Sequence, residues 1–253
     1  GEISIKLDFF VILAKALRPP PAKYYGLEDT EVRYRQRYLD LMANEDVKKV
    51  FLRRSDIVHE IRAFLHSHGY VEVETAMMQA IPGGAAAQPF KTFHNALGSD
   101  FYLRIALELP LKRMLVGGVD KVFEIGRVFR NEGLSRKHNP EFTMLEAYQA
   151  YGDYESMMDL VQGMICHVAE NVLDTLSIEH KDAEGKVTKT IDLTPPWKRV
   201  KYKDLIREKA GADWFEISPE ERRKRAHDLG AEIGKDYADF EITGAVFEKL
   251  IEP

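Results

Sequence analysis

The feature that most constrains this fold is a pair of long extended segments joined by a polar loop. Residues 122–130 and 142–149 are each predicted to be a strand, with side chains alternating between two faces. The connecting residues 131–140 include Gly133 and Pro140, which are typical of a loop. Two strands connected in this way form an antiparallel hairpin. The sequence therefore predicts an α+β fold, with an antiparallel sheet flanked by helices, rather than a doubly wound parallel sheet.

Other segments have the three-to-four-residue apolar spacing of helices with one buried face. These predicted helices run from an Asn44 cap to Gly69, over residues 108–116, onward from an Asp153 cap, and over residues 202–251 with breaks near Pro219 and Gly230. A further strand is expected at residues 70–75, and a hairpin around Gly185.

Both ends of the sequence suggest a piece of a longer protein. The chain begins without Met, and residues 2–7 alternate apolar and polar side chains like a strand. Arg18-Pro19-Pro20-Pro21 then predicts a stiff linker, because proline fixes φ and restricts the residue before it. The charged, aromatic residues 33–40 are typical of a solvated helix face. Residues 250–253 follow a helical pattern without a closing element.

Composition excludes some classes of protein. The net charge of −5 gives no global indication of RNA binding, although a local basic patch would be enough. The single cysteine, Cys166, rules out a disulfide within the chain and suits a reducing compartment. Its place on a predicted helix indicates a small buried hydrophobe rather than a nucleophile. The longest apolar run, residues 9–14, is far shorter than the roughly 20 residues that span a bilayer. We expect a cytoplasmic protein without a membrane segment.

One face of the predicted hairpin is unusually polar. Its members are Glu124, Gly126, Val128 and Arg130 on the first strand and Phe142, Met144, Glu146 and Tyr148 on the second. Because buried charges are costly unless they are paired, this face is either solvated or lines a polar pocket. The loop adds Glu132 and His138 beside Arg130 and Phe142. A guanidinium suits phosphate and an aromatic ring suits a purine, so the hairpin is a candidate nucleotide site.

The small residues 83–87, Gly-Gly-Ala-Ala-Ala, allow another group to approach the backbone closely, or they form a plain flexible loop.

The hairpin residues 129–133 and 138–146 resemble motif 2 of class II aminoacyl-tRNA synthetases, in the form found in subclass IIb. Further stretches, in the right order, make nearly the whole chain similar to lysyl-tRNA synthetases: residues 33–41, 83–87, 102–106 and 111–113. The resemblance implies the class II synthetase fold, incomplete at its C-terminal end. It also implies three parts: residues 1–17 as the last strand of an anticodon-binding (OB-fold) domain, 18–43 as a linker, and 44–253 as a catalytic domain with a helical insertion at about 200–250.

The resemblance also assigns roles residue by residue. Arg130 is the catalytic group, which clamps the ATP α-phosphate and the lysine carboxylate. The implied ATP-binding residues are Arg130, Glu132, His138, Asn139 and Phe142. The implied lysine-binding residues are Gly84, Glu108, Arg130, Glu146 and Tyr148. Several carboxylates suit a substrate that carries two ammonium groups.

The implied reaction activates L-lysine with ATP and transfers it to tRNA(Lys). The lysine carboxylate is already an anion and attacks the α-phosphate directly, so catalysis consists of positioning and charge neutralisation. The sequence has no zinc-protease, Gly-x-Ser-x-Gly or P-loop pattern, and this chemistry needs none. The resemblance further implies Mg²⁺ and a homodimer that forms through motif 1. No metal ligands are expected within this chain.

Four departures from the family pattern stand out. Ala76 follows the predicted strand where the family has the proline of motif 1, which leaves the dimer geometry open. Pro110 alters the expected start of the helix that carries Glu108, and Lys137 replaces a common arginine. Motif 3, with its ATP-binding arginine and the region of the Mg²⁺ carboxylates, has no match before Pro253. We therefore predict that this chain cannot aminoacylate by itself.

Three alternatives remain open at this level. The first is a synthetase-like enzyme that modifies an elongation factor. That enzyme lacks the anticodon-binding domain, whereas residues 2–7 of this chain resemble a strand of that domain. It also tends to differ from this chain at Ala147-Tyr148. Aspartyl- or asparaginyl-tRNA synthetases act on anionic or neutral side chains, which do not suit Glu146. A non-catalytic RNA-binding relative has no need for the full set of nucleotide and ammonium ligands.

Overall fold

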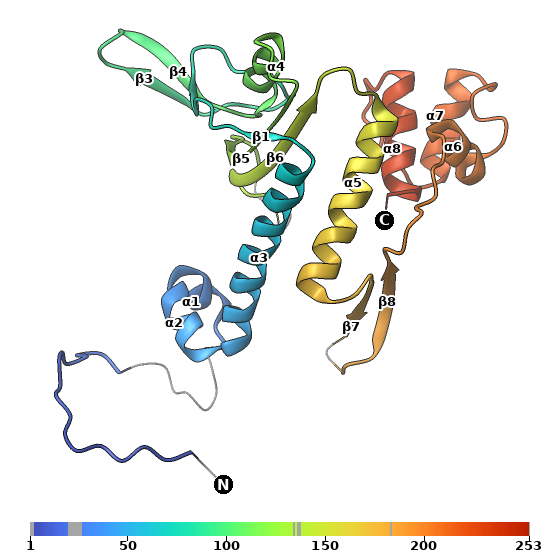
Figure 1. The fold of residues 1–253 in the computed structure, drawn as a ribbon. Helices are drawn as coiled ribbons and strands as arrows, with labels where there is room; N and C mark the ends of the chain where they lie inside the picture. The colour runs from blue at the N-terminus through green and yellow to red at the C-terminus, as the bar shows by residue number, and fades with distance from the viewer. Residues whose placement is uncertain (1–2, 20–26, 134, 136–137, 183, 253) are drawn as a thin grey trace. The chain divides into compact units, whose positions relative to one another are not determined.

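The computed structural model of the chain describes residues 3–19, 27–133, 135, 138–182 and 184–252. The chain divides into two compact units, Gly1–Thr194 and Pro195–Pro253 (Figure 1). We call them the hairpin unit and the helical unit, and we describe each by itself.

The hairpin unit mixes helices with short and long strands. Its helices are α1 (Thr30–Arg35), α2 (Arg37–Ala43), α3 (Glu45–Ser67), α4 (Glu108–Val116), α5 (Tyr154–Val168) and the π-helical η1 (Ala169–Leu173). Its strands are β1 (Val71–Glu72), β2 (Met78–Gln79), β3 (Lys91–His94), β4 (Ser99–Leu103), β5 (Lys121–Phe129), β6 (Glu141–Gln149), β7 (Ser177–Lys181) and β8 (Val187–Asp192). The α+β prediction is confirmed, while the strand expected at residues 70–75 is shorter than predicted.

The predicted hairpin forms the centre of this unit. Strands β5 and β6 pair antiparallel along their whole length, with Glu124 opposite Glu146 and Val128 opposite Phe142. Strand β1 pairs parallel with β5 on its other side, so the sheet order is β1-β5-β6. A second antiparallel sheet has the order β2-β4-β3, and β7 pairs with β8 as the hairpin expected around Gly185.

The two faces of the β5–β6 hairpin have different surroundings. One face packs on α3 and α5, and its contacts are apolar: Phe64, Leu65, Tyr70, Phe123, Ile125, Leu145, Ala147, Leu160 and Met164. This burial supplies most of the driving force for covering the sheet. The other face has an apolar patch around Leu107 and Leu111, but it also carries Glu124 and Glu146. Helices α3 and α5 thus cover one face, while α4 packs on part of the other face beside the polar groups.

The ends of the long helices follow from local sequence signals. Asp153 caps α5 in a capping box with Ser156, as predicted. Gly69 follows α3 with φ of +79°, a conformation that glycine adopts without steric cost. Asn44 occupies the cap position of α3, but its side chain makes no capping hydrogen bond. It bonds instead to Leu27 and Asp40, so the predicted role of its side chain was wrong.

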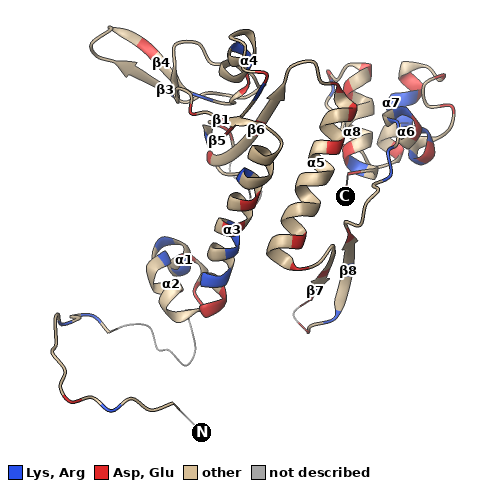
Figure 2. Cartoon of the chain, viewed as in Figure 1, with Lys and Arg blue, Asp and Glu red and all other residues tan. Residues whose placement is uncertain are grey.

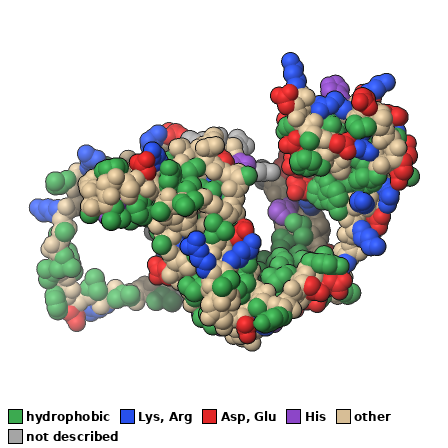
Figure 3. All heavy atoms as spheres, turned by 90° about the horizontal axis from the view of Figure 1, so that it is seen from above, with side chains coloured by type: hydrophobic (Ala, Val, Ile, Leu, Met, Phe, Trp, Pro, Cys, Tyr) green, Lys and Arg blue, Asp and Glu red, His purple; other side chains and the backbone are tan. Residues whose placement is uncertain are grey.

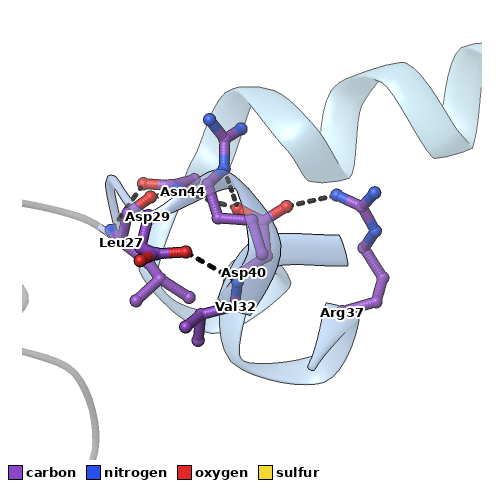
Figure 4. A network of polar contacts seen from close by, with 7 residues as sticks. Leu27, Asp29, Val32, Arg37, Asp40 and Asn44 are labelled. Carbon is purple, nitrogen blue, oxygen red and sulfur yellow. Dashed lines mark hydrogen bonds and ion pairs between the residues drawn. The ribbon is translucent and has the colours of Figure 1, made fainter. Parts of the chain in front are cut away.

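Asp40 in α2 is fully buried, at the centre of a polar network (Figure 4). Its carboxylate accepts hydrogen bonds from Arg33 Nε at 2.9 Å, from Asn44 Nδ2 at 2.6 Å, and from Arg37. Burial by itself raises the pKa of Asp40, but the hydrogen bonds from Asn44, Arg33 and Arg37 more than offset this and lower it below 3.8. The solvated face predicted for residues 33–40 holds only in part: Tyr34, Arg35 and Tyr38 are exposed, whereas Arg33 and Arg37 converge on one buried anion.

The strand predicted at residues 2–7 does not form among the described residues. Residues 3–19 contain no helix or strand, and Ile3, Ile5 and Leu7 are exposed. A strand requires a neighbour for its backbone hydrogen bonds, and no described segment pairs with this one. Assignment of residues 1–17 to an anticodon-binding domain stays a prediction.

The helical unit has a core of its own. It contains α6 (Tyr202–Ala210), α7 (Pro219–Asp228) and α8 (Asp239–Leu250), with breaks at Pro219 and Gly230 as predicted. Trp214 is fully buried, and its indole Nε1 donates to Thr243 Oγ1 at 3.2 Å. Acidic and basic residues are interspersed over the three helices (Figure 2), so this unit has no single sign of charge.

Two smaller predictions concern Cys166 and membranes. Cys166 lies buried in α5, and burial raises the pKa of its thiol, in agreement with the predicted small buried hydrophobe. Among the described residues, no helix combines the length and the apolar character that crossing a membrane requires.

Replacement of Asp40 tests the polar network. Asp40→Asn should lower the melting temperature near neutral pH, because Arg33 and Arg37 lose their buried partner. The pKa of Asp40 is lowered by folding, so its stabilisation is present above the unfolded value of about 3.8 and is lost as the pH falls through the folded value. The difference in melting temperature between wild type and variant should therefore shrink in acid.

Asp46→Asn is the matched control for this series. Among the described residues Asp46 forms an ion pair with Lys49 alone, and its side chain is 93% exposed, so its replacement should change the melting temperature little at any pH. An equal effect of both substitutions at neutral pH would contradict the role given to Asp40.

Candidate active site

The loop between β5 and β6 encloses a cleft of about 490 Å³. Its base is closed by a hydrogen bond from Arg130 N to Pro140 O at 2.9 Å. The cleft is lined by Arg130, Glu132, Gly133, His138, Asn139, Pro140 and Phe142. The structure thus brings together all five side chains predicted for the nucleotide. Lys137 lies outside the described residues.

Each of these side chains has a defined anchor. Glu132 Oε1 accepts from Gln88 N at 3.2 Å, and Asn131 N donates to Gln88 O at 2.7 Å, which ties the hairpin loop to the segment after residues 83–87. His138 Nδ1 lies 2.8 Å from Ser135 Oγ. Asn139 Nδ2 donates to Glu141 O at 2.9 Å. These contacts are local to the loop and its near neighbours.

Arg130 has the geometry of a phosphate ligand. Its Nε donates to Ile105 O at 3.3 Å, and its guanidinium carbon lies 5.4 Å from the centre of the Phe142 ring. Among the residues that the structure describes, its two terminal nitrogens have no hydrogen-bond partner. A planar fork of donors held at one end is suited to binding a phosphate or a carboxylate.

Glu146 and Tyr148 form a second polar group on the same face of the sheet. Tyr148 OH donates to Glu146 Oε2 at 2.7 Å, and Leu107 N donates to Glu146 Oε1 at 2.9 Å. Burial, followed by the hydrogen bond and charge of Glu146 and the charge of Glu108, raises the pKa of Tyr148 well above its usual range. Tyr148 therefore remains a donor to Glu146 at any physiological pH.

Glu108 and Gly84 meet beside this pair. Glu108 opens α4 and forms an ion pair with Lys112 at 2.7 Å. Gly84 has φ of +91°, and a Cβ added there would lie 3.0 Å from Glu108 Cβ and 3.1 Å from Ala106 Cβ. The glycine loop therefore packs against the start of α4, and the alternative of a plain flexible loop does not hold here. Pro110 leaves the predicted bounds of α4 unchanged, because proline is tolerated in the first turn of a helix.

Comparisons with known proteins agree with this arrangement. The family described as tRNA synthetases class II (D, K and N) matches residues 29–243. The chain belongs to this family. It is 50% identical to a lysine--tRNA ligase of Bacillus subtilis (strain 168) over 253 residues, which is 100% of this chain and 50% of the relative. A lysine--tRNA ligase of Staphylococcus aureus is 49% identical over the same length and is also 50% covered, and one of Moorella thermoacetica is 50% identical with 51% covered. The chain spans about half the length of the curated relatives it matches.

Arg104 is a buried charged residue that the sequence patterns did not single out. Glu124, assigned to the polar face, does not line the cleft; it pairs with Arg104 at 2.6 Å, and the side chains are 3% and 0% exposed. Arg104 lies within the resembling stretch 102–106, but nothing in the pattern marks it as buried. The signal that was available is Gly126, which follows Glu124 on the same face and leaves room for a guanidinium.

The family resemblance implies Mg²⁺, so we examined the acidic groups for a site. Within the described ranges, no three His, Cys, Asp or Glu side chains gather in a way that could hold a metal ion. The residues present do not by themselves form the implied site, and no reaction step is assigned to a metal here.

Gly84→Ala tests the close packing of the glycine loop against the start of α4. Gly98 provides a matched control, since it also has a positive φ (+59°) but no neighbour within 4 Å of an added Cβ. Both substitutions should cost about 1 kcal/mol for the left-handed backbone. Only Gly84→Ala must also displace Ala106 and Glu108, so its loss in free energy of unfolding, measured by urea denaturation, should be larger. Equal losses would contradict the packing described here.

Proposed function

We propose that this chain is the central part of a lysine-tRNA ligase, which activates L-lysine with ATP and transfers it to tRNA(Lys). The observation that carries the proposal is the cluster formed by Glu146 and Tyr148, on the sheet face that also bears Arg130, and Glu108 at the start of α4. Two carboxylates suit a substrate with two ammonium groups, and the guanidinium suits its carboxylate. The relatives named lysine--tRNA ligase, about 50% identical over the whole chain, support the same choice of substrate.

In the proposed reaction, the substrate lies between two halves of the site. Glu146, oriented by Tyr148 and Leu107, receives the side-chain ammonium, and Glu108 receives the α-ammonium after exchanging its Lys112 partner. Gly84 lines the same pocket. Arg130 holds the lysine carboxylate and the ATP α-phosphate so that an oxygen of the carboxylate attacks phosphorus and pyrophosphate leaves. The resulting lysyl-adenylate passes its acyl group to the terminal ribose of the tRNA.

The nucleotide half uses the cleft in the hairpin loop. Phe142 stacks on adenine, while Glu132, His138 and Asn139 contact the nucleotide. Mg²⁺ supplies additional neutralisation of phosphate charge when it is bound, with ligands expected mainly outside this chain. For that reason, and because no stretch matches motif 3, we propose that the chain alone does not complete aminoacylation.

Aspartate is disfavoured as a substrate by charge. The family described above includes enzymes designated D and N as well as K. A substrate carboxylate placed against Glu146 would meet a like charge in a half-buried position, which costs binding energy. An amide would leave the Glu146 carboxylate without a cation. Neither alternative has an observation in its favour.

The remaining parts of the proposal concern assembly and location. Val50, Phe51 and Leu52 of α3 are 67%, 46% and 56% exposed, and hydrophobic side chains are visible on the surface in Figure 3. Such a surface supports a homodimer formed through the motif 1 region, which includes Ala76. We further propose that residues 1–17 belong to an anticodon-binding domain, that residues 200–250 are an insertion of the catalytic domain, and that the protein is cytoplasmic.

The test is thermal unfolding with lysine and ATP, each alone and together, against aspartate and asparagine. Lysine at 100 times its dissociation constant should stabilise the chain by about 2.7 kcal/mol, with no stabilisation by the other two amino acids. Glu146→Gln should abolish the lysine effect and leave the ATP effect.

Glu141→Gln is the matched control, because Glu141 lies on the same strand and is 54% exposed. Stabilisation by asparagine or aspartate, or a full lysine effect in Glu146→Gln, would overturn the proposed substrate.

A further inference from the structure

Arg104 is a fully buried side chain that joins three segments far apart in the sequence. Its Nε donates to Arg127 O in β5 at 2.8 Å, and its Nη1 contacts Glu124 Oε1 at 2.6 Å and Thr75 O at 3.1 Å. Glu124 Oε2 in turn accepts from Thr75 Oγ1 at 2.7 Å. The segment after β1, the end of β4 and the first strand of the hairpin are thus fixed to one guanidinium.

The backbone of Arg104 is held as firmly as its side chain. Arg104 N donates to Met77 O at 2.8 Å, and Arg104 O accepts from Phe129 N at 2.9 Å. Phe129 directly precedes Arg130, so this bond sets the distance between the end of β5 and the residues that follow Arg104.

The residues that follow, Ile105–Glu108, each contact a residue assigned to the lysine-binding half of the site or belong to that half themselves. Ile105 O accepts from Arg130 Nε at 3.3 Å, and Leu107 N donates to Glu146 Oε1 at 2.9 Å. Ala106 and Glu108 enclose Gly84. A shift of this short segment would therefore move the whole set of groups assigned to lysine.

The nucleotide half has other anchors. Glu132 is held by Gln88, His138 by Ser135, and Asn139 by the backbone of Glu141. None of these contacts passes through Ile105–Glu108. Arg130 is the exception, since it belongs to both halves.

We propose that Arg104 is a positioning residue that sets the lysine-binding half of the site and not the adenine-binding half. It acts by fixing Ile105–Glu108 relative to β5 and β6 through the Glu124 and Thr75 contacts. This inference rests on the proposed function for its substrate.

Gly126 leaves the space in which the Arg104 guanidinium lies. A Cβ added at Gly126 would lie 2.2 Å from Arg104 Nη2, and that buried nitrogen has no hydrogen-bond partner among the described residues. The guanidinium occupies the space that any other residue at position 126 would fill. Gly126→Ala should therefore displace Arg104 without removing any of its hydrogen-bonding groups.

The first experiment compares lysine and adenosine binding by titration calorimetry in the 253-residue chain and in Arg104→Lys. Adenosine lacks the phosphate that Arg130 is proposed to hold, so it reports on the adenine-binding half alone. The side chain of Arg104→Lys retains the charge beside Glu124 but cannot donate simultaneously to Arg127 O and Thr75 O. Lysine binding should weaken at least ~10-fold while adenosine binding changes less than ~2-fold, because small displacements of substrate-positioning groups have large effects.

Arg127→Lys is the control, since the Arg127 side chain lies on β5 and is 52% exposed, and the backbone carbonyl that accepts from Arg104 is retained. Equal losses for lysine and adenosine in Arg104→Lys would indicate a merely structural role and overturn the proposal, as would unchanged binding of both.

The second experiment needs no ligand and covers the case in which Arg104→Lys folds poorly. Amide hydrogen exchange in peptides spanning residues 104–109 should accelerate roughly 10-fold in Gly126→Ala and in Arg104→Lys, with residues 138–142 unchanged. Uniform acceleration, or none, would overturn the positioning role. If the wild-type chain binds adenosine but not lysine, the proposed substrate fails, while the exchange rates still decide whether Arg104 fixes this segment.

Discussion

The antiparallel register of β5 and β6 decides which side chains of this protein meet. With Glu124 opposite Glu146 and Val128 opposite Phe142, the side chains of Glu124, Glu146 and Tyr148 point to one face, while those of Phe123, Ile125 and Leu145 point to α3 and α5. Since side chains alternate along a strand, a slip of one residue would turn Glu146 and Tyr148 into the apolar core. The register that buries the apolar face therefore also places the side chains of the polar site.

Charged groups are buried in this fold only where opposite charges and hydrogen bonds surround them. Asp40 is held by two arginines and Asn44, and Arg104 by Glu124 and two carbonyl oxygens. Removing one member of a buried pair such as Arg104–Glu124 typically costs about 3–5 kcal/mol, because the other charge is left without compensation. These networks fix the relative positions of segments for which no regular hydrogen-bond ladder exists.

The candidate site is assembled from parts of unequal rigidity. The half proposed to bind lysine draws on a glycine loop, the start of α4 and the middle of β6, which meet through short contacts around Ile105–Glu108. The half proposed to bind the nucleotide is carried by the hairpin loop, whose anchors lie within the loop, at Glu141 and at Gln88. Because Glu108 is paired with Lys112, the α-ammonium group of the proposed substrate would replace an existing cation rather than enter an uncompensated anionic pocket.

Local signals in the sequence determined much of this protein: the hairpin strands, the helix bounds near Gly69 and at Asp153, and the gathering of side chains around Arg130 could all be predicted. Such features depend on side-chain periodicity, on capping, or on residues close together in the chain. The tertiary structure alone decided the partner of Asn44, the burial of Asp40, the absence of a strand at residues 3–7 and the junction formed by Arg104. The partners of Asp40 lie within seven residues of it, but its burial depends on how α1, α2 and α3 pack together. Arg104 pairs with Glu124, which lies 20 residues away, and no described segment pairs with residues 3–7, so no local pattern of residues encodes these outcomes.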